Sequence, residues 1–296
     1  MSGLARPVSP ARMFWTDFAE SRLALLGLAL VVVIVLAAVT APWIAPQNPY
    51  DQAGLSLLDA RLPPGTEGSG GYVHLLGTDA AGRDVLSAIL FGLRTSIFVA
   101  VAAGAVALCL GTVAGLFAAW RGGLAEQAVM RLVDLQLSLP AILLALVLVA
   151  ALGQGTQQVV IALVAAQYAY FARTAHGAAS AERHRDYMDA ARVLALPPAR
   201  QMLRHLLPNV LPPLIVVATV QVANAIAIEA TLSFLGVGMP VTEPSLGTLI
   251  ANGFQFMLSG RYWISVYPGL ALLALIIGIN LVGDQLRDVL NPRLRK

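Results

Sequence analysis

The stretch DYMDAARVLALPPARQMLRHLLP, residues 186–208, is a polar interruption between two apolar spans, and it decides how the rest of the chain is interpreted. Two consecutive prolines, Pro197 and Pro198, divide it. A helix must end before them, because the residue before a proline is pushed out of the α region, whereas Pro198 can open the next helix. We therefore expect two short helices, at 185–194 and 199–207, joined by a stiff corner and lying across the membrane face.

Spacing alone leaves two interpretations of this segment open. An amphipathic helical hairpin at the membrane interface can simply anchor a helix bundle. Alternatively, the segment is the largest ordered feature between the spans and passes force into them. The second helix is expected to stop at Pro208, which keeps both helices outside the bilayer.

The composition indicates whether the chain folds in water or in a membrane. Of 296 residues, 58% are hydrophobic and 12% are charged, and the mean hydropathy is +0.75. Soluble domains carry about 25% charged residues, so this chain is expected to be a polytopic membrane protein. The single cysteine, Cys109, excludes a disulfide within the chain. The arginines are spread over several loops, which gives no reason to expect a nucleic-acid partner.

Six apolar spans predict an all-α polytopic fold. A helix rises 1.5 Å per residue and needs about 20 residues to cross the hydrocarbon core. The fourth span is short and contains Gln167, Tyr168 and Tyr170, so we expect it to pack among its neighbours and to continue to about residue 175. The predicted spans are residues 23–41, 95–119, 135–152, 159–171, 211–234 and 263–282.

The placement of basic residues predicts the orientation. Four segments on one side of the predicted membrane hold fifteen of the nineteen Lys and Arg residues: 1–22, 120–134, 173–209 and 283–296. Cytoplasmic loops carry the excess of Lys and Arg, so both termini are expected to be cytoplasmic. The segment 42–94 is then external, and its Pro, Gly and Asp residues predict turns.

We expect one boundary in the chain. It separates residues 1–94, an N-terminus with the first span and the external loop, from a five-helix core at 95–296. The core contains the polar loop 176–209, which includes the two expected short helices.

At this loop the chain resembles the inner-membrane permeases of binding-protein-dependent ABC importers. Their signature is Glu-Ala-Ala, three residues, Gly, nine residues, then Ile-x-Leu-Pro. Here it reads Asp189-Ala190-Ala191, three residues, Ala195, nine residues, then His-Leu-Leu-Pro at 205–208. The spacing is intact, and three signature positions differ.

Two further stretches narrow the resemblance to the second permease of the dipeptide, oligopeptide and nickel branch. One is Leu-Gly-Thr-Asp at 76–79 with Gly-Arg-Asp-Val-Leu-Ser at 82–87. The other is Glu-Ala-Thr-Leu-Ser-Phe-Leu-Gly at 229–236 with C-terminal matches that end in Pro-Arg-Leu at 292–294. The resemblance runs from the first span to the C-terminus.

The resemblance implies a fold, a mechanism and partners. The fold would be the type I ABC importer permease fold in the bacterial cytoplasmic (inner) membrane, with a coupling helix that docks into a groove on an ATP-hydrolysing subunit. The partners would be a homologous second permease, two ABC ATPases, an external solute-binding protein and the lipid bilayer. The chain itself would bind no cofactor, because ATP and Mg²⁺ would sit on the ATPases. The docking residues carried over are Asp189, Ala190, Ala191, Leu194, Ala195, Leu196 and Pro197.

The departures from the signature have physical consequences. Asp189 is one methylene shorter than the usual glutamate, and an exposed ion pair is worth only about 0–1 kcal/mol, so apolar contact must dominate the docking. Ala195 stands at the glycine corner, and it would cost about 1–2 kcal/mol if the corner needs a left-handed residue. His205 is expected to be a polar neighbour of the interface and not a metal ligand.

The sequence offers no nucleotide or metal chemistry of its own. A phosphate-binding loop needs Gly-x-x-x-x-Gly-Lys-Ser/Thr, and the only lysine is Lys296. The histidines do not form a His-x-x-x-His pair, so no metal site is expected. The chain is therefore predicted not to be an enzyme, and a membrane hydrolase that uses Ser233 or Asp84 is a remote alternative, since neither has a paired base.

Three polar residues in the fifth span are candidates for the transport pathway. Glu229, Asn224 and Gln221 recur at near-helical spacing, and a charge at membrane depth usually faces a cavity or a partner. Glu229 can line the pathway near an external gate, or it can form a structural hydrogen bond to a neighbouring helix. The same residue keeps a proton-coupled secondary transporter as the alternative function. The resemblance implies a dipeptide, an oligopeptide, a glutathione-like peptide or a nickel complex as the solute.

Smaller signals concern the helix ends and helix packing. Asp84 is placed to cap the second span, and Arg83 is a candidate contact for the external binding protein. Gly104, Gly111 and Gly115 should let helices approach closely. Pro140 is expected to kink the third span.

Overall fold

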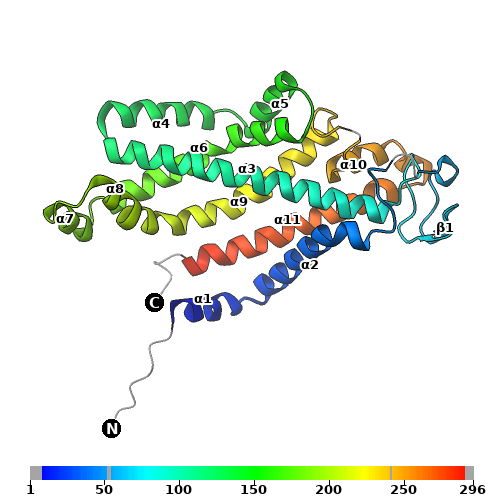
Figure 1. The fold of residues 1–296 in the computed structure, drawn as a ribbon, viewed down its shortest axis with the longest axis horizontal. Helices are drawn as coiled ribbons and strands as arrows, with labels where there is room; N and C mark the ends of the chain where they lie inside the picture. The colour runs from blue at the N-terminus through cyan, green and yellow to red at the C-terminus, as the bar shows by residue number, and fades with distance from the viewer. Residues whose placement is uncertain (1–8, 52–54, 241, 291–296) are drawn as a thin grey trace, which may run out of the picture.

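The computed structural model describes residues 9–51, 55–240 and 242–290, and its long helices run side by side along one axis (Figure 1). The predicted all-α fold is confirmed apart from one short two-stranded hairpin. In chain order the elements are α1 (Pro10–Ala19), α2 (Arg22–Ile44), η2 (Leu57–Asp59), β1 (Thr66–Glu67), β2 (Val73–His74), α3 (Val85–Arg121), α4 (Gly123–Leu137), α5 (Ala141–Leu152), α6 (Thr156–Glu182), α7 (Asp186–Val193), α8 (Pro198–Arg200), η3 (Gln201–Leu206), α9 (Leu207–Phe234), α10 (Leu246–Phe254), η4 (Met257–Ser259) and α11 (Trp263–Leu290).

Four helices of the described chain are long and apolar enough to cross a membrane, and a bent pair makes a fifth. They are α2, α3, the continuous helix 198–234 and α11, and the pair is α4 with α5. The predicted span 159–171 lies in α6, which has 27 residues and is therefore much longer than predicted. Arg173 and His176 end the apolar run but not the helix, since both are compatible with helical backbone. The count of six crossings stays a prediction.

Glycines bring α3 and α6 into close contact. A Cβ added at Gly111 would collide with the backbone of Tyr168 and the side chain of Phe171, and one added at Gly115 would collide with Ala172 and Ala175. The predicted close approach at these positions is confirmed. At Gly104 an added Cβ would meet only Val222, at 3.4 Å, which is an ordinary contact.

We expect Gly111→Ala to destabilise the protein, whereas Gly104→Ala should be nearly neutral. The methyl group at 111 forces α3 away from α6, and overpacking of this kind costs about 1–3 kcal/mol. Thermal unfolding of the purified protein measures both. Equal stability of the two variants would mean that α3 and α6 do not pack as described.

The third predicted span is broken more sharply than expected. The sequence predicts one helix over 135–152 with a kink at Pro140, but α4 and α5 meet at an angle of 90°. Pro140 cannot donate a backbone hydrogen bond and stands as the residue before α5. The kink predicted at Pro140 is confirmed, and it is large enough to divide the span into two helices.

The second short helix of the polar loop does not stop at Pro208, contrary to prediction. The helix runs on from α8 through η3 into α9, and Pro208 lies in the first turn of α9. A π-helical stretch, residues 201–206, absorbs the proline, with Leu207 N–H bonded to the carbonyl of Met202 five residues back. Wider helical turns of this kind occur as local bulges. The predicted opening of this helix at Pro198 is confirmed.

The predicted external segment is ordered in part. Strands β1 and β2 form a hairpin that pairs Thr66 with His74. The next helix begins at Val85, capped by Asp84, whose Oδ2 accepts a hydrogen bond of 2.7 Å from Ser87 N. The capping role of Asp84 is confirmed. The boundary placed between residues 94 and 95 falls inside α3, so the described fold has no break there.

Candidate functional site

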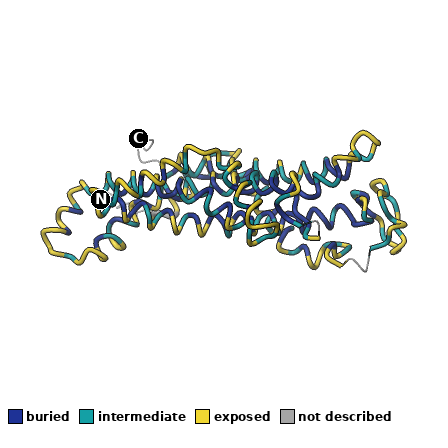
Figure 2. The backbone as a smooth tube through the Cα atoms, turned by 90° about the horizontal axis from the view of Figure 1, so that it is seen from above, coloured by how far each residue is buried: buried dark blue, intermediate teal, exposed yellow. Residues whose placement is uncertain are grey.

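Helix α7 projects at one end of the molecule, beyond the ends of the long helices (Figure 1). Its outer surface is exposed, in contrast to the buried centre of the bundle (Figure 2). Met188 and Ala191 face inward, with 0% and 4% of their surface exposed. This amphipathic arrangement fixes α7 to the bundle on one face and presents the opposite face to solvent.

The exposed face and the residue after it carry large apolar side chains. Val193 is 86% exposed and Leu194 71%. Ala190 lies exposed on the same helix, which keeps this surface flat. Contiguous exposed apolar surface outside the membrane marks an interaction site. Of the remaining predicted docking residues, Leu196 is half-buried and Asp189, Ala195 and Pro197 are exposed.

A tyrosine connects α7 to two long helices. The Tyr187 hydroxyl donates to Glu182 Oε2 of α6 at 2.7 Å and accepts from Asn209 Nδ2 of α9 at 3.2 Å. Burial, and less strongly the hydrogen bond to Glu182, raises the pKa of Tyr187 to about 12. The hydroxyl therefore stays protonated and keeps donating at neutral pH. Sequence reasoning assigned no role to Tyr187, because its partners lie on helices that the local pattern does not relate to α7.

The corner after α7 places a residue in the left-handed region, which is the condition under which alanine was expected to be costly. Ala195 has φ of 50°. Its N–H bonds to Arg192 O at 2.9 Å, and Leu196 N–H bonds to Ala191 O at 3.2 Å. These two bonds form a Schellman motif, in which glycine normally occupies the left-handed position. Alanine is strained there by about 1–2 kcal/mol.

Replacing Ala195 with glycine should therefore stabilise the corner by about 1 kcal/mol, which slows amide hydrogen exchange in α7 about five-fold. The matched control is Ala199→Gly in helical α8, where glycine destabilises by about 0.5–1 kcal/mol. Hydrogen–deuterium exchange, measured by mass spectrometry, detects the effect of both substitutions. Faster exchange in the Ala195→Gly variant would contradict the strain assigned to this residue.

Asp189 already has a basic partner within its own helix. Its Oδ1 lies 2.7 Å from Arg192 Nη1, and both side chains are largely exposed. Exposed pairs of this kind contribute about 0–1 kcal/mol. The resemblance implies a basic partner on the ATPase, which would have to compete with Arg192 for Asp189, and the loose or absent ion pair expected from the shorter aspartate stays a prediction.

Gln221 and Asn224 line a groove of about 1110 Å³ between α6, α9 and α11. Asn224 Nδ2 donates to Gln221 Oε1 at 3.3 Å, and Gln167 Nε2 donates to the carbonyl of Gln221 at 3.0 Å. Further polar groups in the groove come from Arg173 and Arg287. The groove therefore offers both charged and amide groups to a polar solute.

Glu229 lies apart from that groove and is fully enclosed. Ser96 Oγ of α3 donates to its Oε2 at 2.7 Å, and Ser233 Oγ donates to its Oε1 at 2.8 Å. None of the Glu229 side chain is exposed. The structure thus separates Glu229 from Gln221 and Asn224, and its geometry favours the structural hydrogen bond over the pathway lining.

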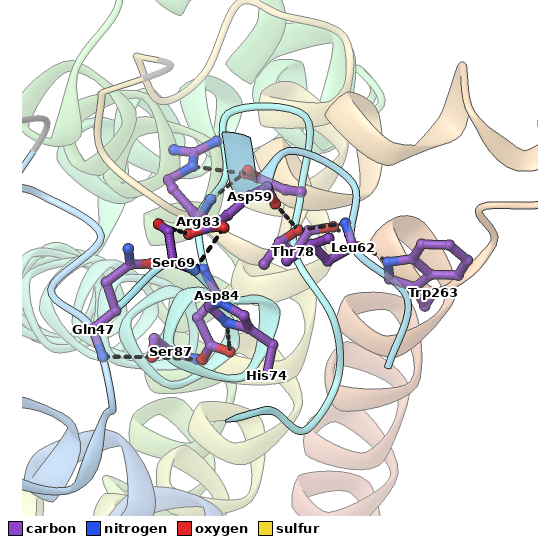
Figure 3. Close-up of polar contacts among 11 residues, drawn as sticks. Gln47, Asp59, Leu62, Ser69, His74, Thr78, Arg83, Asp84, Ser87 and Trp263 are labelled. Atoms are coloured by element: carbon purple, nitrogen blue, oxygen red, sulfur yellow. Dashed lines mark hydrogen bonds and ion pairs between the residues drawn. The ribbon is translucent and has the colours of Figure 1, made fainter. Parts of the chain in front are cut away.

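Arg83 is buried in the external loop. Its Nε lies 2.7 Å from Asp79 Oδ2, and 8% of the residue is exposed (Figure 3). Figure 3 draws His74 and Asp84, whose Nδ1 and Oδ1 atoms lie 3.0 Å apart, and this contact fastens the hairpin to the start of α3. A role for Arg83 in contacting a binding protein stays a prediction, and this geometry favours a role in loop structure.

The family described as "Binding-protein-dependent transport system inner membrane component" matches residues 111–296, which include α7 and the groove. The family "N-terminal TM domain of oligopeptide transport permease C" matches residues 9–64. The chain belongs to the binding-protein-dependent transport permeases. Its C-terminal motif at 292–294 lies outside the described residues.

Relatives of this permease cover nearly all of its length. The dipeptide transport system permease protein DppC of Haemophilus influenzae is 37% identical over 98% of this chain and 97% of its own. The protein of the same name from Escherichia coli K12 is 40% identical over 98% of this chain and 95% of its own. The di/tripeptide transport system permease protein DppC of Pseudomonas aeruginosa is 38% identical over 97% of this chain and 93% of its own.

A solved structure supports the fold of the permease. A chain of the inward-facing MetNI methionine ABC transporter matches with a TM-score of 0.55. It is 19% identical, and the match covers 69% of this chain and 96% of that chain. The expected type I importer permease fold is therefore confirmed, while this likeness carries no information on the solute.

Proposed function

We propose that this permease is one half of the membrane channel of an ATP-driven importer that carries dipeptides or oligopeptides across the bacterial cytoplasmic membrane. It pairs with a homologous permease, two ABC ATPases and an external solute-binding protein. The observation that carries the proposal is the exposed apolar face of α7, with Val193 and Leu194 outside the bundle. Peptides as the solute class are supported by the names of the full-length relatives.

The mechanism follows from how α7 is attached. Closure of the ATPase dimer moves the docked face of α7, and Tyr187 transmits this movement to Glu182 on α6 and Asn209 on α9. Both helices line the groove that holds Gln221 and Asn224. Movement of α7 therefore changes the width of the groove, which we assign to the solute pathway. ATP and Mg²⁺ act on the partner ATPases, since the only lysine of this chain is Lys296.

The proposed orientation places both termini in the cytoplasm. The described start of α1 and end of α11 lie toward the end of the molecule that holds α7 (Figure 1). This arrangement agrees with the excess of basic residues in the segments that are predicted to be cytoplasmic. The proton-coupled alternative has no supporting observation, because Glu229 is enclosed by Ser96 and Ser233 and does not line the groove.

Uptake by the complete importer in proteoliposomes tests the proposal. Radiolabelled dipeptide should accumulate only with ATP on the ATPase side and with the binding protein outside. Accumulation driven by a pH gradient without ATP would contradict the proposed function.

A further inference from the structure

A second groove, about 670 Å³ in volume, lies between α2 and α3 and has no part in the proposed function. Its walls are mostly apolar, with Val39 from α2 and Phe98 and Val101 from α3. These three side chains are 52–61% exposed. The groove is open at the surface of the bundle, where these side chains are exposed.

Polar side chains gather at the external end of this groove. Arg94 and Thr95 belong to α3, and the Tyr50 hydroxyl lies 3.3 Å from Thr95 Oγ1. Thr156 Oγ1 donates to Glu243 Oε2 at 2.8 Å, and both of these residues also line the groove. The external end thus presents one cation, one anion and several hydroxyl groups.

Arg94 differs from two other arginines of the predicted external side. Arg83 pairs with Asp79, and Arg61 lies over the ring of Phe256, 5.6 Å from its centroid. Within the described part of the chain, Arg94 forms no ion pair, and it is not paired with Glu243 although both line one groove. The groove therefore holds two opposite charges that each lack a charged partner among the described residues.

The apolar part of the groove has the depth of one lipid leaflet. It follows α3 from Arg94 to Ala105. At 1.5 Å per residue this distance is about 16 Å. Half of a typical hydrocarbon core is about 15 Å, so an acyl chain whose headgroup lies at Arg94 would reach the end of the groove.

We propose that this groove binds one outer-leaflet phospholipid with a primary-amine headgroup, phosphatidylethanolamine. The Arg94 guanidinium binds the phosphate, since it presents paired donors to phosphate oxygens. The Glu243 carboxylate binds the ammonium group. One acyl chain lies along Phe98 and Val101. The assignment to the outer leaflet rests on the proposed orientation of the chain.

The charges favour a zwitterionic lipid over a helix of a partner protein. An apolar helix in the groove would leave Arg94 and Glu243 buried without partners, which is costly. A phospholipid with an amine satisfies both charges and the apolar wall together. Phosphatidylglycerol has the phosphate but no cation for Glu243, so it should bind less well.

Native mass spectrometry of the complete importer, purified from membranes that contain both lipids, tests the proposal. Arg94→Gln should lower retained phosphatidylethanolamine at least five-fold, and Arg94→Lys should restore part of it. Glu243→Gln should remove the preference for phosphatidylethanolamine over phosphatidylglycerol. The control is Arg261→Gln, on the predicted external side but outside the groove. It should change neither the amount of phosphatidylethanolamine retained nor the preference over phosphatidylglycerol.

A second measurement guards against variants that fail to assemble. Phe98→Trp places a fluorophore on the exposed wall, and phosphatidylethanolamine with brominated acyl chains should quench the added fluorescence more than brominated phosphatidylglycerol. Equal quenching by the two lipids, or unchanged lipid retention in Arg94→Gln, would overturn the proposal. So would a cross-link from residue 98 to the partner permease. Lipid retention is measured independently of transport, so the lipid proposal can fail while the proposed function holds.

Discussion

Replacing Ala190 with arginine is expected to abolish coupled transport while the permease still folds. Ala190 lies on the exposed face of α7, so the larger side chain meets no neighbour within the chain. On the ATPase it would insert a long charged group into an apolar contact. A charge without a partner in an interface costs several kcal/mol, and about 3 kcal/mol weakens docking about 100-fold. Peptide uptake and ATP hydrolysis by the reconstituted importer measure the effect.

The matched control for this variant is Ala128→Arg. Ala128 is an exposed alanine of α4 and not of α7, so the same change of side chain should leave uptake and its coupling to hydrolysis intact. If Ala190→Arg left both rates at the level of the unmodified importer, α7 would not be the docking helix.

Glu229→Ala is expected to have the second largest effect, on stability and not on the solute pathway. The carboxylate accepts from Ser96 on α3 and from Ser233 on α9, so its loss leaves both buried hydroxyl groups without an acceptor and opens a cavity, although Ser233 Oγ still accepts from Met239 N–H. Lost hydrogen bonds and cavity formation together cost about 3 kcal/mol or more. Thermal unfolding of the assembled importer measures this loss.

Glu229→Gln is the control, because its amide keeps the size of the side chain and can bond both serines. It should retain most of the stability and most of the ATP-driven uptake. The opposite pattern, in which Glu229→Ala unfolds normally while both variants lose uptake, would place Glu229 in the pathway. Loss of uptake in Glu229→Gln alone would revive a role for its proton.

The features that the sequence predicted well depend on local chemistry. Asp84 caps α3, because a carboxylate before a helix accepts a free backbone N–H whatever the rest of the fold does. Gly111 and Gly115 lie one turn apart and mark a face without side chains, which fits a closely packed helix. The corner at Ala195 was located by the glycine of the family signature, and its left-handed backbone meets the condition under which alanine was expected to be costly.

The features that the sequence did not predict depend on the surroundings of a residue. The fourth span was expected to end at about residue 175, but α6 continues to Glu182, and Arg173 within it forms an ion pair with Asp134 of α4. Pro208 was expected to end a helix, but a π-helical turn before it lets the helix continue. Glu229 appeared to share one side of a helix with Asn224. Residues five apart on an α-helix point about 140° apart, so Glu229 is enclosed by Ser96 and Ser233 while Asn224 lines the groove.

Cysteine cross-linking between α7 and the ATPase tests the central claim most directly. Ala190→Cys, in a chain whose only native cysteine is replaced by Cys109→Ser, is assembled with ATPases that carry single cysteines along their permease-facing surface. The account predicts a cross-link at position 190 whose yield changes when ATP closes the ATPase dimer. An intact, ATP-hydrolysing complex that forms no such cross-link would contradict it.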